Sequence, residues 1–199
     1  MHFLFIAPAA FLAPIIFEMI KAWTSKAQGD TSVGSKGFLT LNPLKFFEPI
    51  GFFLMLIFNI GWAQPVPTST LYYKDRRKGL ILTYTIPSAA CLVLGMIVTF
   101  IYAIIFTNAS LPWGLLIGVH ALGRALISVA VINLLIPVHP FAAFRLLPLF
   151  LSPQKISSFN QYERPAQIIM IICIVFGLIP AIINPIVGFF MNLVLLAWM

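Results

Sequence analysis

The residues of this sequence that could do chemistry lie in or beside long apolar stretches. Glu18 follows Phe17 and precedes Lys21 by three positions, near the end of the first apolar stretch. Residues three apart in a helix are neighbours, so the Glu18 carboxylate could form an ion pair with Lys21. A carboxylate could also act as a general base, provided that a neighbouring group activates the water from which it takes a proton.

Two further polar residues, His120 and Arg124, are four positions apart and therefore share one face of a predicted helix. That face could carry protons, bind a lipid headgroup or be turned toward a partner subunit. At 1.5 Å per residue, Arg124 and Glu18 differ in predicted depth by only several ångströms in a bilayer core of roughly 30 Å. One hypothesis is therefore an intramembrane polar cluster of Glu18, Lys21, His120 and Arg124. The alternative is that Lys21 extends its ammonium to the membrane surface and that Glu18 follows it.

The composition identifies an integral membrane protein. Of the 199 residues, 61% are hydrophobic and only 9% are charged, and the mean hydropathy of +1.02 is far above that of soluble domains. The formal net charge of +7 reports orientation in such a protein rather than nucleic-acid binding. No basic stripe interleaved with aromatic residues favours a nucleic-acid partner.

Apolar length then predicts the elements that must position these side chains. A spanning helix needs about 20 predominantly apolar residues. Stretches of this length are found at residues 3–22, 79–107, 113–136 and 166–199. We expect Pro180 and Pro185 to divide the last stretch into a span and a shorter second crossing. The prediction is a single transmembrane domain over residues 1–199, an all-α polytopic bundle of about five transmembrane helices.

Residues 46–63 are apolar but barely long enough to span, and they contain Glu48, Pro49 and two glycines. If they crossed the bilayer, the eleven basic residues outside the helices would divide four against seven between its two faces. If they re-enter, all eleven lie on one face. Cytoplasmic loops collect Lys and Arg, so we expect a re-entrant or interfacial segment and cytoplasmic basic loops. Such a segment should pack inside the bundle, because lipid cannot satisfy its backbone.

Four sequence stretches then carry a family resemblance. They read GDTSVGSKGFLTLNPLKFFEPIG at 29–51, GWAQPVP at 61–67, KDRRKG at 74–79 and INLLIPVHPFAAFR at 132–145. In order and spacing the chain resembles the compact bacterial branch of the site-2 protease family, the intramembrane zinc metalloproteases. The match runs without a gap from Phe17 to Gly51. It implies a family active site built from H-E-x-x-H on the first helix and the aspartate of a later L-D-G motif.

This sequence departs from the family at each of the three zinc ligands. The positions of the two histidines hold Phe17 and Lys21, and the position of the aspartate holds Ala142. Glu18 remains at the position of the general base. A glutamate base in such an enzyme needs water whose pKa a metal has lowered to about 7. We therefore expect no enzyme activity, no metal and no other cofactor.

The resemblance and its gaps lead to one leading function and two alternatives. The leading expectation is a catalytically inactive site-2-protease-like scaffold or accessory subunit of a larger membrane complex. We expect it in a bacterial inner membrane, with lipids and other integral membrane subunits as partners. An active or divergent metallopeptidase would need a metal site built from residues such as His120, His139 and Glu48, for which no spacing supports a site. The third possibility is a non-cleaving binder of client transmembrane helices. For that role Asn133, which matches a family asparagine expected to hold substrate backbone, is a candidate docking residue; otherwise it forms an interhelical hydrogen bond.

Overall fold

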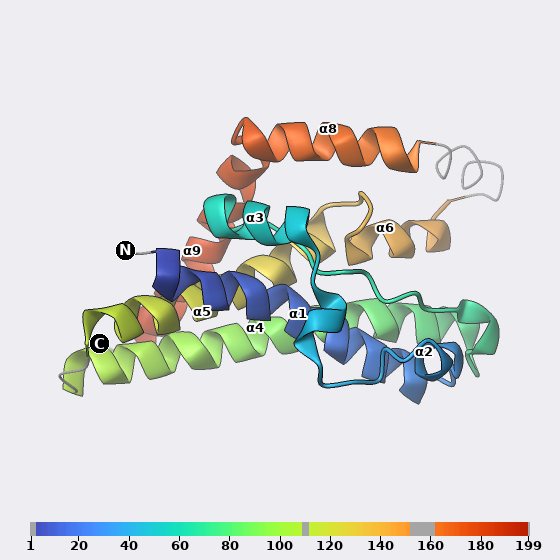
Figure 1. Ribbon diagram of the computed structural model, residues 1–199, viewed down its shortest axis with the longest axis horizontal. Helices are drawn as coiled ribbons and strands as arrows, with labels where there is room; N and C mark the ends of the chain where they lie inside the picture. Colours follow the sequence, from blue (N-terminus) through green and yellow to red (C-terminus); the bar gives the residue numbers. More distant parts are fainter. Residues whose placement is uncertain (1–2, 109–111, 152–161, 199) are drawn as a thin grey trace.

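A computed structural model describes residues 3–108, 112–151 and 162–198, and this part of the chain is entirely helical and irregular, without strands (Figure 1). Its helices that are long and apolar enough to cross a membrane are α1 (Phe3–Ala27), α4 (Arg76–Asn108), α5 (Trp113–Leu135) and α9 (Leu178–Trp198). The shorter elements are α2 (Ser32–Ser35), η1 (Pro43–Phe46), α3 (Pro49–Phe58), η2 (Thr70–Tyr72), α6 (Ala142–Leu146), η3 (Leu147–Leu149) and α8 (Glu163–Val175). The predicted all-α membrane bundle is confirmed.

Helices α1, α4 and α5 pack against one another, and α9 packs against α4 and α5. The crossing of α4 and α5 is close because glycines face each other there. A Cβ on Gly95 would lie 3.0 Å from the carbonyl oxygen of Gly123, and a Cβ on Gly123 would lie 2.6 Å from Thr99 Oγ1. Small residues allow such close approach between membrane helices, where dispersion contacts drive association.

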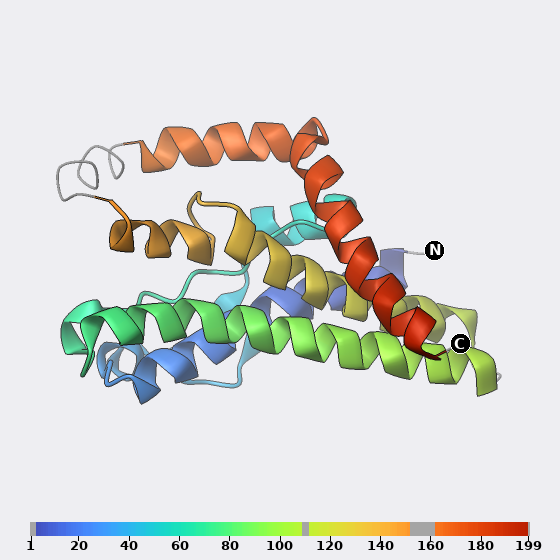
Figure 2. The same ribbon diagram turned by 180° about the vertical axis from the view of Figure 1, so that it is seen from behind.

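The two ends of the bundle differ in charge. Figures 1 and 2 show the end of α1, α2, η2 and the start of α8 at one end, and the start of α1, the end of α4, the start of α5 and the end of α9 at the other. The first of these ends carries Lys26 in the last turn of α1, Arg76 in the first turn of α4 and Arg164 in the first turn of α8. Lys155, one of the eleven basic residues counted above, lies outside the described residues.

Residues 46–69 form a hairpin, called the re-entrant hairpin below, which includes the segment 46–63 that was expected to be re-entrant or interfacial. Helix α3 ends at Phe58, and the next residue, Asn59, adopts a left-handed conformation with φ of 57°. The chain then returns in extended form to the end from which it came (Figure 1). The two arms touch backbone to backbone, since a Cβ on Gly61 would lie 2.1 Å from the carbonyl oxygen of Gly51.

Hydrogen bonds fix the hairpin inside the bundle. The backbone N–H of Gln64 donates to the carbonyl of Phe46 at 2.8 Å, which joins the returning arm to η1. The hydroxyl of Ser128 on α5 donates to the carbonyl of Asn59 at the tip. Residues 60–63 and Val66 of the returning arm are buried by protein, as non-helical backbone inside a membrane requires, whereas Gln64 and Pro67 are exposed.

The C-terminal apolar block breaks at a different place from the one predicted. Gly177, with φ of 77°, separates α8 from α9, whereas Pro180 and Pro185 both lie inside α9. A proline in the first turn of a helix leaves no hydrogen bond unmade, so Pro180 does not interrupt α9. Helix α8 has 13 residues, about 20 Å in length, and is shorter than a bilayer core of about 30 Å.

Candidate functional site

Glu18 and Lys21 form a buried ion pair on α1. The side-chain Nζ of Lys21 donates to Glu18 Oε1 at 2.7 Å, and the two residues are 3% and 5% exposed, respectively. The structure thus places these two predicted site residues together. The expectation that Lys21 reaches the membrane surface is wrong, because α1 continues to Ala27 and keeps Lys21 inside the bundle.

The re-entrant hairpin supplies a second partner to the Glu18 carboxylate. The backbone N–H of Val66, on the returning arm, donates to Glu18 Oε2 at 2.7 Å. The Lys21 ammonium lies 5.7 Å from the centre of the Tyr84 ring, within the range of a cation–π contact. Tyr84 is in turn hydrogen-bonded to Thr68 on the same arm, at 2.8 Å. The sequence argument missed Val66 and Tyr84, because nothing in the sequence shows that residues 60–69 return along α1.

In the family that the chain resembles, two further positions hold zinc ligands, and here both are apolar and buried. Phe17 is 2% exposed and Ala142 is 2% exposed, and both belong to one cluster of buried side chains. The Lys21 ammonium lies 6.0 Å from the centre of the Phe17 ring. The three degenerate positions are therefore all buried.

Asn133 ties α5 to the start of α6. Its Oδ1 accepts a hydrogen bond from the backbone N–H of Ala142 at 3.1 Å, and its Nδ2 donates to the carbonyl of Val129 at 2.9 Å. Asn133 is 5% exposed. Both ends of its amide are used inside the chain, which matches the interhelical interpretation. The geometry gives no open side for the predicted docking of a peptide or helix.

Arg124 and His120 lie apart from the Glu18 pair. The Nη2 of Arg124 donates to Asn184 Oδ1 on α9 at 3.3 Å, and no ion pair joins it to a carboxylate within the described residues. His120 packs against the ring of Tyr102, with ring centres 5.0 Å apart. The hypothesis of a Glu18–Arg124 contact is therefore wrong. The depth estimate placed both residues at one level but could not give the direction in which each points around its helix.

His139 lies in the turn before α6 and contacts α8. Its Nε2 is 3.4 Å from Glu163 Oε1. Burial lowers the pKa of His139 below its usual value, and the charges of Arg145 and Lys21 lower it further, while Glu163 opposes these effects. A neutral imidazole is thus favoured near pH 7, in a link between the turn and α8.

A second polar cluster, which the sequence argument did not identify, fixes the turn after α1. Asp30 is fully buried and accepts hydrogen bonds from Ser25 Oγ at 2.9 Å, Ser32 Oγ at 2.6 Å and the Ser69 N–H at 2.7 Å. Burial alone would raise the pKa of the Asp30 carboxyl. The hydrogen bonds from Ser32, Ser69 and Ser25 outweigh burial and hold this pKa below its ordinary value. Ser25 also bonds Tyr73 at 3.0 Å, so the cluster joins α1 to the segment that leads into α4.

The described residues do not fit a zinc ion at the position implied by the family resemblance. Phenylalanine and alanine offer no ligand atom, and Lys21 donates its hydrogens to Glu18 instead of offering a lone pair. Among residues 3–108, 112–151 and 162–198 no group of three His, Cys, Asp or Glu side chains could hold a metal. His120, His139 and Glu48, which a divergent metal site would need, belong to three separate environments.

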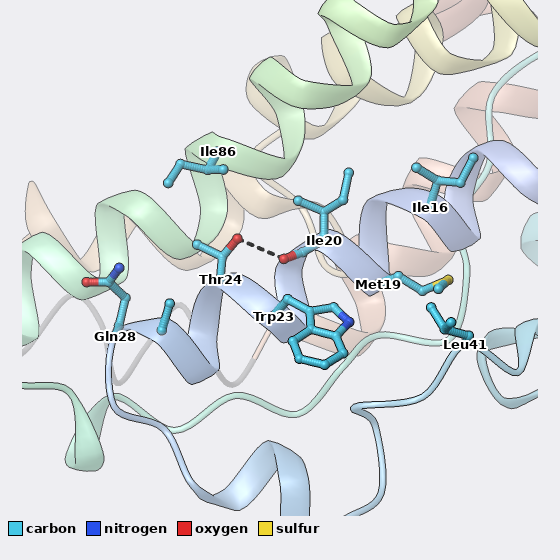
Figure 3. Close-up of a pocket in the computed structure, with 9 residues that line it drawn as sticks. Ile16, Met19, Ile20, Trp23, Thr24, Gln28, Leu41 and Ile86 are labelled. Atoms are coloured by element: carbon cyan, nitrogen blue, oxygen red, sulfur yellow. Dashed lines mark hydrogen bonds between the residues drawn. The ribbon is translucent and has the colours of Figure 1, made fainter.

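An apolar groove lies on another face of α1. It has a volume of about 520 Å³ and opens between α1 and α4 (Figure 3). Its apolar wall includes Ile16, Met19, Trp23 and Ile86, and its lining excludes Glu18. The groove thus lies on the surface between α1 and α4 and is separate from the Glu18–Lys21 ion pair.

Comparisons with known proteins give a partial relative. The chain is 32% identical over 80 residues to the Bacillus subtilis protein named "Putative zinc metalloprotease YwhC", and the match covers 40% of this chain and 36% of that protein. The chain thus matches little more than a third of the length of this curated relative. No family model matches the chain. No solved structure matches it either.

Proposed function

We propose that this chain is a catalytically inactive relative of the site-2 proteases that serves as a structural or accessory subunit of a larger membrane complex. The partial identity to a protein named as a zinc metalloprotease supports a site-2-protease-like origin. We place the chain in a bacterial inner membrane, with the end that carries Lys26, Arg76 and Arg164 in the cytoplasm, because cytoplasmic loops collect Lys and Arg.

The observation that carries this proposal is the bond between Lys21 and Glu18. Lys21 stands where the resembling family has its second zinc-binding histidine. Its ammonium brings a positive charge to the carboxylate, so a dication at the same place would meet both a like charge and a set of groups without lone pairs. The carboxylate therefore serves as the partner of a cation from its own helix.

Retained packing without the family's chemistry supports a role in assembly. The re-entrant hairpin remains fixed by Ser128 and Val66, and the start of α6 remains fixed by Asn133. The chain keeps these internal contacts, although its ligand positions hold Phe17, Lys21 and Ala142. Its role would then depend on the surfaces that it offers to other subunits rather than on bond cleavage.

Two measurements on the full chain test the proposal. Elemental analysis should find no stoichiometric zinc in the wild-type protein, and extraction of the native membrane in mild detergent should recover the chain within a larger assembly. The triple variant Phe17→His, Lys21→His, Ala142→Asp restores the family's ligand set and is the positive control for metal binding. Stoichiometric zinc in the wild-type chain, or its recovery as a free monomer, would contradict the proposal.

The groove between α1 and α4 favours one second candidate, a non-cleaving binder of client transmembrane helices. Its open apolar wall could receive a helix, which the buried Phe17 and Asn133 could not do. Photocrosslinking from Met19 or Ile86 separates the two functions. A spread of crosslinked clients would favour the binder, whereas one constant neighbour would favour the subunit.

A further inference from the structure

Arg124 lies at the middle of a membrane-spanning helix. Eleven residues of α5 precede it and eleven follow it, so it is about 17 Å from either end at 1.5 Å per residue. A charged side chain at this depth is costly unless another group compensates its charge. A group that compensates the positive charge of Arg124 is therefore expected close to its guanidinium.

The described part of the chain does not compensate this charge. The Arg124 guanidinium has five N–H groups, and its hydrogen bond in the structure is the one from Nη2 to the neutral amide of Asn184, at 3.3 Å. Its Nε is buried without a partner among the described residues. No carboxylate of the described residues lies within ion-pair distance of it.

Every acidic side chain of the sequence is described, and each is engaged elsewhere. The chain has five Asp and Glu residues. They are Glu18, paired with Lys21; Asp30, held by three serines; Glu48, which accepts from the Gly51 N–H at the start of α3; Asp75, which accepts from the Arg77 N–H at the start of α4; and Glu163, whose Oε1 lies 3.4 Å from His139 Nε2. A carboxylate for Arg124 must therefore come from another molecule.

The surroundings of Arg124 form an accessible face rather than a sealed interior. Arg124 is only partly buried, and His120 lies one helical turn before it on the same face of α5. A cavity of about 180 Å³ opens beside His120, between α4 and α5. On α9, Gly188 lies one turn after Asn184, and a Cβ there would meet nothing within 4 Å. A second helix could thus approach Arg124 from outside the chain.

We propose that His120 and Arg124 on α5, together with Asn184 on α9, form a docking face for a transmembrane helix of another protein that carries an Asp or Glu at mid-membrane depth. A carboxylate there would accept from N–H groups of the guanidinium, in the bidentate geometry that arginine favours. A lipid phosphate is disfavoured, because headgroups lie at the helix ends, about 17 Å away. This inference rests on the proposed role as a subunit and names the chemistry of its partner.

The test uses the full chain in its native membrane, with the photoreactive residue p-benzoylphenylalanine at position 188. We expect one main crosslinked product, a transmembrane segment with an acidic residue. Arg124→Leu should lower the crosslinking yield by roughly tenfold or more, because loss of one member of a buried charge pair costs at least that much in affinity. Arg124→Lys should retain part of the yield, and Arg164→Leu, at the exposed start of α8, should retain all of it.

A charge exchange keeps the test independent of any folding defect. Changing the partner's acid to its amide leaves this chain untouched and should lower the yield as much as Arg124→Leu does. Combining Arg124→Glu with an arginine in place of the partner's acid should restore the yield.

The inference is overturned if the crosslinked helix has no acidic residue, if only lipid is crosslinked, or if Arg124→Leu leaves the yield unchanged. In the last case a persisting complex would leave the proposed function standing. Recovery of the chain as a free monomer in mild detergent, without any protein crosslink, would instead contradict both this inference and the proposed function.

Discussion

Replacing Lys21 by methionine removes the positive charge from the buried pair and leaves the Glu18 carboxylate with the Val66 N–H as its hydrogen-bond donor. Both residues are at most 5% exposed, so water cannot replace the lost ammonium. Removing one member of a buried pair typically destabilises a protein by roughly 3–5 kcal/mol. For a chain of this length that corresponds to a fall in Tm of roughly 6–20 °C.

Removing both charges should cost much less. A buried ion pair gains little over apolar groups of similar size, since desolvation offsets most of its attraction. In the double variant Glu18→Gln, Lys21→Met, the glutamine oxygen can still accept from the Val66 N–H. We expect its Tm to lie close to that of the wild-type protein and well above that of Lys21→Met alone.

Thermal unfolding in one detergent, followed by the amount of monodisperse protein in size-exclusion chromatography, measures these shifts. Lys26→Met is the matched control, because Lys26 lies on the same helix but is exposed, and its change should move Tm by less than about 2 °C. If Lys21→Met behaves like Lys26→Met, or if the double variant is no better than the single one, then Lys21 is not the internal partner of Glu18.

Two further predictions concern stability. The folded-state pKa of Asp30 lies below its ordinary value, so its carboxylate stabilises the fold above the unfolded-state pKa of about 3.9 and this contribution is lost as pH falls through the folded-state pKa. Asp30→Asn should therefore lower Tm at pH 7 and flatten its decline between neutral and acidic pH; an unchanged pH profile would refute this role. Gly61→Ala should destabilise the re-entrant hairpin by about 1–3 kcal/mol, because the added Cβ would lie 2.1 Å from a backbone oxygen. Gly188→Ala, where a Cβ meets nothing within 4 Å, should leave the stability of the isolated chain equal or higher by up to about 1 kcal/mol, and equal losses in both variants would show that crowding is not the cause.

Apolar length and charge distribution were enough to predict the main helices and the re-entrant segment. The stretches 113–136 and 79–107 correspond closely to α5 and α4, because a lipid environment demands long, uninterrupted apolar helices. The break near the C-terminus was misplaced. Proline signals a break only where its missing N–H or its ring disturbs the helix, whereas the left-handed conformation of Gly177 interrupts it directly.

The polar contacts were only partly predictable. The Glu18–Lys21 pair follows from helical spacing, which is local information. The Arg124–Asn184 contact depends on where α9 packs, and the Val66–Glu18 contact depends on the path of the returning arm. To predict such long-range contacts, one must know how each helix is rotated about its own axis. The predicted depth of a residue in the membrane does not give this rotation.

The re-entrant hairpin also constrains the order of events during membrane insertion. Its extended arm emerges from the ribosome well before α5, yet the carbonyl of Asn59 at its tip is covered by Ser128 of α5. Until α5 arrives, the Asn59 carbonyl lacks this partner and hydrocarbon cannot replace it, whereas the N–H groups of Gln64 and Val66 already have partners in Phe46 and Glu18. We therefore expect the tip of the hairpin to reach its final position only after α5 has been synthesised.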